Sequence, residues 1–448
     1  MRPFNITHLG AEHSVTGSCH LLQAQSCNIL IDCGIVQDNA QLAPIMDWSV
    51  RPADIDYVFL THAHIDHIGR LPELIEAGFA GEIICTHPTY DLLEPMLRDA
   101  MGFSGKSKYE TERLCDTINE LAWGFEYGEV FALKKGISFK LGNAGHILGS
   151  CFIRFKSKDP EWSVIFSGDL GPRDTPILPP PDQPDKCDYL VLESTYGDRL
   201  HEDRKERVAR LGGILAKALA DGGKVFIPSF ALGRTQELIY EIDRIFSDDE
   251  SGKAFPGLYD KGGIPVFIDS PLGLEITEIY SGNVDFWDKA ARDIFAKGDH
   301  PIDFDHLYSA RGHRDHIKLL DMPGPAVIIA GSGMCSGGRI VNHLRQGLND
   351  RKNDIFFVGY QAKGTLGRSI LKYGKRRGGY VYVEGEKIFI TADIHTLTGY
   401  SAHADQKGLL EWVSSMPAKP ARIKLVHGER RAQEALAAIL KRAAYSVV

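Results

Sequence analysis

The sequence has no closely spaced pair of cysteines. Its eight cysteines are scattered over 448 residues, and no two of them form a Cys-x-x-Cys pair. This spacing argues against a zinc ribbon and against a disulfide framework. We therefore expect most of the cysteines to be small core residues in a reducing compartment.

Long apolar runs are also absent. No run approaches the roughly 18 residues that a membrane-spanning helix needs, and residues 1–5 lack the apolar stretch of a signal peptide. Hydrophobic residues make up 43% of the chain and charged residues 25%. That balance is typical of a folded protein and disfavours disorder. We expect a soluble, non-exported, cytoplasmic protein with no membrane partner.

An excess of positive charge is missing too. The chain has 51 Lys and Arg residues and 59 Asp and Glu residues, which gives a net charge of −8. This net charge disfavours a surface that is positive all over for binding nucleic acid. A local basic groove is still compatible with it, because the attraction of a charged ligand depends on where the charges lie. The densest basic stretch holds Lys372, Lys375, Arg376 and Arg377.

Short β-rich runs alternate with helical patterns in the first part of the chain. The apolar runs 57–60, 164–166 and 189–192 predict buried strands. Their ends lead into polar residues, where α/β sheets place their chemistry. Five prolines between residues 176 and 184 predict a surface loop.

A second pattern starts after about residue 200. It alternates strands and helices, which predicts a parallel α/β sheet. The expected strands are 224–227, 326–330 and 355–358, and the expected helices are 206–220, 236–246 and 339–348. The last part returns to short strands at 388–391 and 423–426 and ends in a helix at 431–442.

Four potential metal ligands occur within six residues directly after the strand at 57–60. They are His62, His64, Asp66 and His67, in the pattern His-x-His-x-Asp-His. Imidazole and carboxylate groups suit Zn²⁺ and similar divalent ions. A turn can aim the first two at one ion and the last two at a neighbouring ion. A lone histidine is usually structural, but this pattern indicates a metal site.

Two later strand ends supply further candidates. His146 lies in Asn-Ala-Gly-His-Ile-Leu-Gly-Ser, and Asp169 lies in Ser-Gly-Asp-Leu-Gly. Taken alone, each could be a loop residue that hydrogen-bonds the backbone. Together with the histidine-rich run, they indicate a site for two ions.

With these motifs the sequence resembles the β-CASP family of metallo-β-lactamase-fold ribonucleases, which includes RNase J and the nuclease subunit of the pre-mRNA 3′-end cleavage factor. Asp32, in Leu-Ile-Asp-Cys-Gly, matches the first acidic motif of the superfamily. Glu193 in Glu-Ser-Thr-Tyr-Gly, His403 in Ser-Ala-His-Ala-Asp and His427 in Val-His-Gly-Glu resemble three further motifs. An RNase J-type C-terminal domain is expected to be absent.

The resemblance implies an α/β fold. We expect a metallo-β-lactamase αββα sandwich with an inserted β-CASP α/β domain. The predicted boundaries are 1–200 for the first part of the metallo-β-lactamase domain, 201–380 for the β-CASP domain and 381–448 for the C-terminal part.

The resemblance also implies the ligands of two divalent ions, with zinc expected and manganese as the alternative. One ion is held by His62, His64 and His146, the other by Asp66, His67 and His427, and Asp169 bridges the two. Two adjacent cations can share a hydroxide and neutralise charge on an attacked phosphate.

Three more residues receive roles from the resemblance. His403 corresponds to the general acid that protonates the leaving ribose oxygen, and Glu193 holds its imidazole in the protonated form. Asp32 orients a ligand or the histidine-rich loop. The alternatives are a strand-end turn for Asp32, a salt-bridged strand end for Glu193 and a metal ligand for His403. His395 is a competing candidate for the acid.

Candidate RNA contacts lie in three segments. The glycine-rich stretches 228–234 and 331–339 link a strand to a helix, where backbone amides can receive phosphate, and 361–368 matches a β-CASP segment. Tight packing and a solvated basic loop are the alternatives. The predicted contacts are Ser229, Arg234, Ser332, Lys363, Thr365 and Arg368.

The expected activity is metal-dependent hydrolysis of RNA phosphodiester bonds in RNA processing or decay. The expected partner is RNA, in single-stranded form, and a homo-oligomer stays open. His427 matches the RNA-directed branch of the family, whereas the DNA-directed branch has an aliphatic residue there. Two alternatives remain: a hydrolase of the same fold that acts on DNA or a small ester, and a non-catalytic RNA-binding scaffold.

Overall fold

The computed structural model describes residues 3–36, 48–202, 206–246, 254–259, 263–359, 361–397 and 399–448. The chain forms two compact units. Unit 1 comprises Met1–Leu200 and Ala402–Val448, and unit 2 comprises His201–Ser401. All eight cysteines are buried and carry free thiols. None of the helices in the described ranges combines the length and the apolar character that a membrane crossing requires.

Two six-stranded sheets form the centre of unit 1. In spatial order, the first contains β1 (Phe4–Gly10), β2 (Cys19–Ala24), β3 (Cys27–Ile31), β4 (Tyr57–Phe59), β5 (Glu82–Thr86) and β6 (Ala122–Phe125). The second contains β20 (Arg422–Val426), β11 (Tyr189–Glu193), β10 (Glu161–Phe166), β9 (Cys151–Lys158), β8 (Ile137–Asn143) and β7 (Val130–Ala132).

Apolar side chains from both sheets of unit 1 form one core between them. The ring of Phe59 on β4 lies edge-on to Phe139 on β8 and to Phe155 on β9, with centroid separations of 4.9 and 4.8 Å. Edge-to-face pairs of this kind add stability beyond the area that the rings bury. The two sheets are therefore held face to face by aromatic packing.

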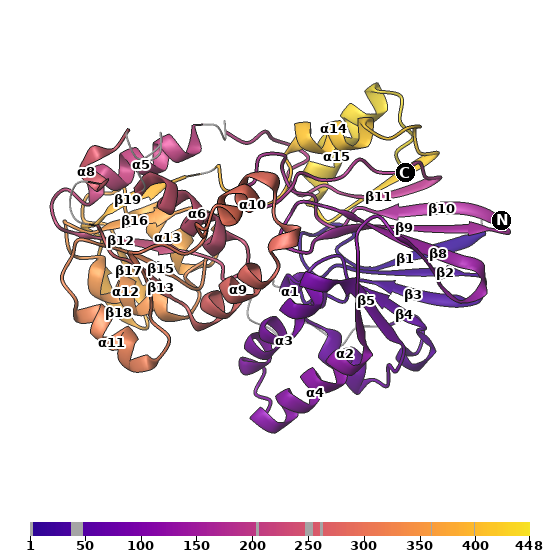
Figure 1. The fold of residues 1–448 in the computed structure, drawn as a ribbon, viewed down its shortest axis with the longest axis horizontal. Coiled ribbons are helices and arrows are strands. Elements are labelled where there is room, and N and C mark those ends of the chain that lie inside the picture. The colour runs from indigo at the N-terminus through magenta and orange to yellow at the C-terminus, as the bar shows by residue number, and fades with distance from the viewer. Residues whose placement is uncertain are drawn as a thin grey trace. The chain divides into compact units, whose positions relative to one another are not determined.

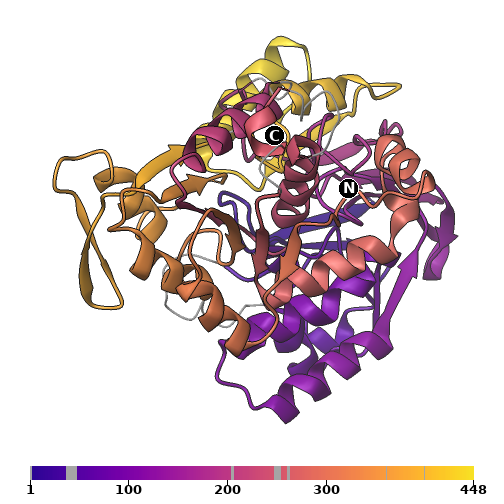
Figure 2. The ribbon, with the colours of Figure 1, turned by 60° about the vertical axis from the view of Figure 1, so that its left-hand side comes forward.

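Helices cover the outer faces of both sheets in unit 1 (Figure 1). The first sheet is covered by helices from the first part of the chain, α1 (Ile65–Ile68), α2 (Leu71–Glu76), α3 (His87–Gly102) and α4 (Lys108–Leu121). The second is covered by α14 (Gln406–Ser414) and α15 (Arg430–Arg442). These two helices, yellow in Figures 1 and 2, lie side by side in both views. The unit is the αββα sandwich expected from the resemblance.

Several helices of unit 1 start at capping residues. The Ser107 side chain accepts a hydrogen bond from the backbone N–H of Glu110, and the Glu110 carboxylate accepts one from the Ser107 backbone, so that α4 starts with a capping box. Asp405 caps α14 by accepting from the Gly408 N–H. Such caps satisfy backbone donors that the first turn of a helix leaves unpaired.

Unit 2 is built on a second α/β arrangement. Its sheet contains β14 (Leu307–Ser309), β13 (Val266–Asp269), β15 (Ala326–Ala330), β12 (Lys224–Pro228), β16 (Asp354–Phe357) and β19 (Asp393–Thr396). All neighbouring strands are parallel, as the sequence predicted.

The helices of unit 2 are α5 (Arg207–Ala218), α6 (Arg234–Phe246), α8 (Pro256–Tyr259), α9 (Pro271–Gly282), α10 (Lys289–Ala296), α11 (His313–Asp321), α12 (Arg339–Gly347) and α13 (Leu366–Tyr373). An antiparallel hairpin of β17 (Tyr380–Val383) and β18 (Glu386–Phe389) follows α13. Three short 3₁₀ helices, η1 (Pro52–Asp54) and η2 (Lys134–Gly136) in unit 1 and η3 (Val284–Phe286) in unit 2, complete the set of described elements.

The division into units differs from the predicted boundary near residue 380. Unit 2 extends to Ser401 because β19 adds to its sheet beside β16, with Asp354 opposite Asp393 and Phe357 opposite Thr396. The strand predicted at 388–391 corresponds to β18 and likewise belongs to unit 2. Short strands alone do not reveal which sheet they join.

The aromatic core of unit 1 leads to a stability prediction. Phe139 is 2% exposed and contacts Phe59, so Phe139→Ala would leave a cavity and lower the free energy of unfolding by about 3–5 kcal/mol. Phe103 is 83% exposed, and Phe103→Ala serves as the control, with an expected change below about 0.5 kcal/mol. Urea unfolding of both variants gives the comparison, and equal midpoints would contradict the prediction.

Candidate metal centre

One turn of the chain after β4 brings four polar side chains together. His62 lies in the loop after the strand, His64 immediately precedes α1, and Asp66 and His67 lie on α1 itself. His62 and His67 are fully buried, at 0% and 1% exposed. Because α1 is only four residues long, it acts as a tight turn that directs these side chains into unit 1.

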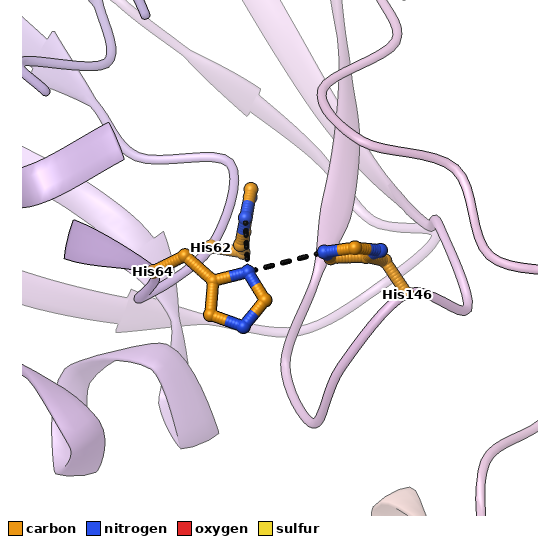
Figure 3. A group of neighbouring side chains, drawn as sticks. All are labelled: His62, His64 and His146. Carbon is orange, nitrogen blue, oxygen red and sulfur yellow. Dashed lines mark hydrogen bonds between the residues drawn. The ribbon is translucent and has the colours of Figure 1, made fainter. Parts of the chain in front are cut away.

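Three histidines form the first group. The Nε2 atom of His62 and the Nε2 atom of His146 each lie 3.1 Å from Nδ1 of His64 (Figure 3). His146 comes from the loop between β8 and β9. Zinc–nitrogen bonds of about 2.0–2.1 Å in a tetrahedral site place ligand nitrogens roughly 3.3 Å apart. The three imidazoles therefore have the spacing of ligands that share one ion.

The second group joins α1 to the end of β20. His67 Nε2 lies 3.2 Å from His427 Nε2, and Asp66 Oδ2 lies 3.6 Å from the same nitrogen of His427. His427 has a φ of 49°, a left-handed conformation that few non-glycine residues adopt. Its backbone N–H donates to the Ala11 carbonyl at 2.7 Å, which holds the turn in place.

Asp169 lies between the two groups. Its Oδ2 atom is 3.6 Å from His62 Nε2 and 3.3 Å from His67 Nε2, so one oxygen faces both sets of ligands. Its Oδ1 atom is buried, accepts no hydrogen bond within the described ranges and lies 3.5 Å from His427 Nδ1. A buried carboxylate oxygen needs a positive charge or a donor. This residue therefore fits the bridging position between two cations.

The outer nitrogens of the ligand imidazoles contact protein groups. His146 Nδ1 donates to the Ala402 carbonyl at 2.9 Å, and His67 Nδ1 lies 2.7 Å from Asp32 Oδ2. His427 Nδ1 lies 3.1 Å from the Thr195 hydroxyl. These contacts fix the ring orientations and turn the Nε2 atoms toward the site, which is how outer partners usually orient metal-binding histidines.

Asp32 collects hydrogen bonds from several segments. It is 1% exposed and accepts from the Thr61 N–H at 2.8 Å and from the Ser18 hydroxyl at 3.0 Å, besides its contact with His67. The Asp32 carboxylate thus holds the histidine-rich turn through Thr61 and contacts the predicted ligand His67. This placement agrees with an orienting role, because a simple strand-end turn would not require contacts from three segments.

Burial keeps the first histidine group neutral. It holds the pKa of His62 and of His146 well below the usual range and lowers the pKa of His64 to about 4. Neutral imidazoles keep the lone pairs that a metal ion needs. The ring nitrogens that face one another at 3.1 Å therefore form a ready donor set.

The second group contains the charged residues. Burial would raise the pKa of Asp66, but the neighbouring His67 and His427 outweigh it and lower the pKa to about 2. Burial also opposes a charge on His67, yet the carboxylates of Asp169, Asp32 and Asp66 raise its pKa well above the usual value. Both pKa shifts show that the surroundings of Asp66 and His67 favour positive charge.

Glu193 and His403 form a pair beside the ligand groups. Glu193 ends β11 and lies 3.3 Å from Nδ1 of His403, while the Leu170 N–H donates to the same carboxylate at 2.7 Å. Burial would lower the pKa of His403, but Glu193 and then Asp169 raise it to about 9. The neighbouring carboxylates therefore favour the protonated imidazole, the form that a general acid needs.

The competing candidate His395 is engaged elsewhere. It lies on β19 in unit 2, where its Nε2 atom is 2.6 Å from Asp354 Oδ1 on the neighbouring strand β16. This contact already engages the His395 Nε2 atom within the sheet of unit 2. The pair in unit 1 is the better candidate for proton transfer.

A second cluster of histidine and aspartate in unit 2 has a different geometry. Asp269 Oδ2 lies 2.6 Å from His316 Nδ1 and 2.6 Å from His343 Nε2, and Arg339 donates to Oδ1 at 2.8 Å. Burial would raise the pKa of Asp269, but these donors lower it. The two histidines and the arginine already satisfy the carboxylate, so this cluster ties β13 to α11 and to the start of α12.

The predicted RNA contacts divide into buried and exposed residues. The Ser229 hydroxyl donates to the Phe230 carbonyl, and Arg234 is 8% exposed, paired with Glu237 at 2.6 Å. The Ser332 hydroxyl bonds the Gly337 carbonyl, Thr365 caps α13, and Lys363 and Arg368 are exposed. The two exposed cations are the members best placed to meet a phosphate, and the RNA roles of all six stay predictions.

Three supporting residues were not singled out from the sequence. Thr61 and Thr195 lie next to predicted site residues and hold Asp32 and His427, respectively, through their hydroxyls. Their positions directly beside or within the motifs are the signal that could have found them. Ser18, which donates to Asp32, has no such signal because nothing near it in sequence marks a site.

Three family models match the chain. The metallo-β-lactamase superfamily matches residues 15–211, the β-CASP domain matches 235–370, and the Zn-dependent metallo-hydrolase RNA specificity domain matches 387–448. The ribonuclease TTHA0252 of Thermus thermophilus is 37% identical over 97% of this chain and 95% of its own length. The chain belongs to the β-CASP family of metallo-β-lactamase-fold ribonucleases. The resemblance inferred from its motifs is thereby confirmed, and with it the fold class.

More distant β-CASP relatives extend the comparison. The transcription termination factor FttA is 32% identical over 95% of this chain in Methanocaldococcus jannaschii and over 96% in Pyrococcus horikoshii, and in both cases 67% of that protein is covered. A solved protein of unknown function from Enterococcus faecalis V583 has a TM-score of 0.55 at 10% identity, over 94% of this chain and 93% of that one. That likeness concerns the fold alone.

The support that Asp32 gives to the metal centre can be tested. Asp32→Asn replaces an acceptor by a group that also donates, so His67 loses its anionic partner, and metal affinity should fall by about 10–100-fold. Asp56→Asn is the matched control, because Asp56 accepts the Asn28 backbone N–H at 2.9 Å and contacts none of the predicted ligand residues in the described contacts. Equilibrium dialysis with metal analysis measures both variants. Wild-type affinity in Asp32→Asn would contradict the assigned support.

Proposed function

We propose that the chain hydrolyses the phosphodiester bonds of single-stranded RNA in RNA processing or decay, with two zinc ions as its cofactors. The observation that carries the proposal is the position of Asp169, whose Oδ2 atom faces both His62 and His67. A protonated His403 lies 3.8 Å from the same oxygen. Ligands for two cations and an acid for the leaving group therefore occupy one site.

Each part of the site has a defined task in this reaction. Two bound cations would supply an activated water and neutralise charge on the phosphate. Asp169 and the neighbouring histidines would hold these ions, and Asp32 keeps His67 turned inward. The Nδ1 atom of His403 faces Glu193, so the proton for the leaving ribose oxygen comes from the opposite nitrogen, Nε2.

The donor set supports zinc as the physiological metal. The first group consists of three neutral imidazoles, and imidazole suits zinc better than it suits magnesium or calcium, which prefer oxygen. Manganese is the alternative, because the second group contains a carboxylate as well as two histidines. Dialysis of the metal-free protein against equal zinc and manganese distinguishes the two: preferential uptake of manganese would overturn the choice of zinc.

RNA as the substrate is supported by the ribonuclease relative and by the C-terminal match to an RNA specificity domain. His427 supports it as well, since its imidazole contributes to the second group at 3.2 Å from His67. The alternative of a non-catalytic scaffold predicts lost ligands. The described site instead has a complete set, so hydrolysis is the function that the geometry favours.

Removal of a ligand should abolish cleavage. Asp169→Ala takes away the bridging carboxylate and His62→Ala removes one nitrogen of the first group. Loss of metal support worth several kcal/mol lowers the rate by about 10³-fold or more. His87→Ala, at a half-exposed histidine outside the site, should keep the wild-type rate. Parallel assays on 5′-labelled RNA and DNA of the same sequence give the readout, together with the bound metal.

Two results of these assays would change the conclusion. If Asp169→Ala cleaved RNA at the wild-type rate, the two-cation mechanism would be wrong. Cleavage of DNA with no cleavage of RNA would favour the DNA-directed alternative. The fragment pattern from labelled RNA also separates internal cleavage from stepwise removal of 5′ nucleotides.

The role of His403 can be separated from that of a ligand. His403→Ala should keep both metal ions and lose about 10²–10⁴-fold in kcat, the usual contribution of a general acid. His395→Gln keeps a hydrogen-bonding group toward Asp354 and should retain the wild-type kcat. Metal content and single-turnover rates measure the effect. If His403→Ala binds one ion fewer, His403 is a ligand and another group supplies the proton.

A further inference from the structure

The β17–β18 hairpin of unit 2 carries aromatic side chains on its outer face. Val381, Val383 and Ile388 are buried and join the core that includes residues of α12 and α13. The alternate positions, Tyr380, Tyr382 and Phe389, are 41%, 63% and 51% exposed. Large exposed apolar groups that gather on one face usually mark an interaction site.

These side chains form one continuous surface. Tyr380 pairs with Phe389 across the hairpin, and Tyr382 pairs with Lys387. The ring centroid of Tyr380 lies 5.8 Å from that of Tyr382 and 6.2 Å from that of Phe389. The Lys387 ammonium lies 4.0 Å from the centre of the Tyr380 ring and 5.1 Å from that of Phe389. We call Tyr380, Tyr382, Lys387 and Phe389 the aromatic face.

Basic residues lead directly into this hairpin. Lys372, Lys375, Arg376 and Arg377 are all exposed, and they lie at the end of α13 and in the turn before β17 (Figure 1). Lys372 and Arg376 each lie over the ring of Tyr373, at 5.1 and 5.3 Å. We call these four residues the basic segment. Aromatic rings and cations thus alternate along one stretch of about 20 residues.

Few negative charges oppose this surface. Glu384 and Glu386 lie at the hairpin turn, and Glu384 is paired with Arg345 at 3.1 Å. The protein as a whole has a net charge of −8. The excess of cations in the basic segment is therefore opposite in sign to the net charge of the chain. A surface of this kind is complementary to a polyanion.

We propose that the aromatic face binds unpaired bases of single-stranded RNA by stacking, while the basic segment contacts the phosphates. Every base has a flat π-face, so such binding tolerates any sequence and contributes about 1–3 kcal/mol per stacked base. The four exposed cations of the basic segment favour a polyanion over a protein partner without negative charge. The proposal rests on RNA as the substrate and adds a binding site that contains none of the ligand residues.

The test uses the triple variant Tyr380→Ala/Tyr382→Ala/Phe389→Ala in the full chain. Its dissociation constant for a 5′-labelled single-stranded RNA should rise by at least about tenfold, which corresponds to the loss of one or two stacked bases. Fluorescence anisotropy measures the binding, with Asp169→Ala as the background so that the RNA stays intact. Circular dichroism and metal content should remain those of the parent protein, since all three side chains point outward.

Two control variants separate stacking from other effects. Tyr380→Phe/Tyr382→Phe keeps both rings and should bind RNA within about twofold of the parent protein. Phe103→Ala/Tyr109→Ala removes two rings of unit 1 that are 83% and 75% exposed, and it should also leave affinity unchanged. Binding that weakens equally in all three variants would overturn the stacking assignment.

The salt dependence tests the basic segment. Each lost contact to a phosphate of a single strand lowers the slope of log K against log salt by about 0.7. Lys375→Gln/Arg376→Gln/Arg377→Gln should therefore reduce the slope by roughly 2, whereas the triple alanine variant of the aromatic face should keep it. An unchanged slope in the glutamine variant would remove the phosphate contacts from the proposal.

The remaining outcomes distinguish this proposal from the proposed function. If the wild-type chain binds single-stranded RNA through the aromatic face but does not cleave it, the proposed function fails and the stacking site stands. If the chain cleaves RNA and the triple alanine variant binds RNA as tightly as its parent, the stacking site fails alone. A variant that changes from dimer to monomer in sedimentation, with unchanged RNA affinity, would make the face a contact between copies of the chain.

Discussion

A buried carboxylate is the constraint on which the site of unit 1 depends. Asp169 is 2% exposed, and its Oδ2 atom lies 3.6 Å from the His62 imidazole and 3.3 Å from the His67 imidazole. An ionised carboxylate is costly in such a place unless positive charge or donors compensate for it. Two cations held by His62, His67 and their neighbours would meet that requirement and would supply the positive charge that phosphate chemistry needs.

The sandwich of unit 1 explains how distant segments reach this carboxylate. Strands β10, β11 and β20 run parallel, and Glu193 lies opposite Val426 in their register. Asp169, Glu193 and His427, which end or follow these three strands, therefore reach one edge of the sheet. The hydroxyls of Thr61 and Thr195 then fix the orientation of residues around the two ligand groups. A site built on strand ends in this way is held by the core rather than by loops alone.

In unit 2, the buried charged groups are paired with one another. Arg234 with Glu237, and Asp269 with its histidines and Arg339, are satisfied internally and stabilise the starts of helices. The rings of the β17–β18 hairpin have no such burial. Charge and flat aromatic surface together favour an extended polyanion with bases, which gives unit 2 a binding role that is chemically distinct from metal-assisted hydrolysis.

The strand–helix alternation and the histidine-rich turn could be predicted from the sequence, because spacing along one turn or one strand fixes which side chains point together. The sequence also carried the family motifs. The structure adds three features that local spacing does not show: the contact between His67 and His427, which the family resemblance implied, the extension of unit 2 to Ser401 by β19, and the pairing of His395 with Asp354. Those outcomes depend on which strands pair, and strand order is set by long-range packing that local spacing does not encode.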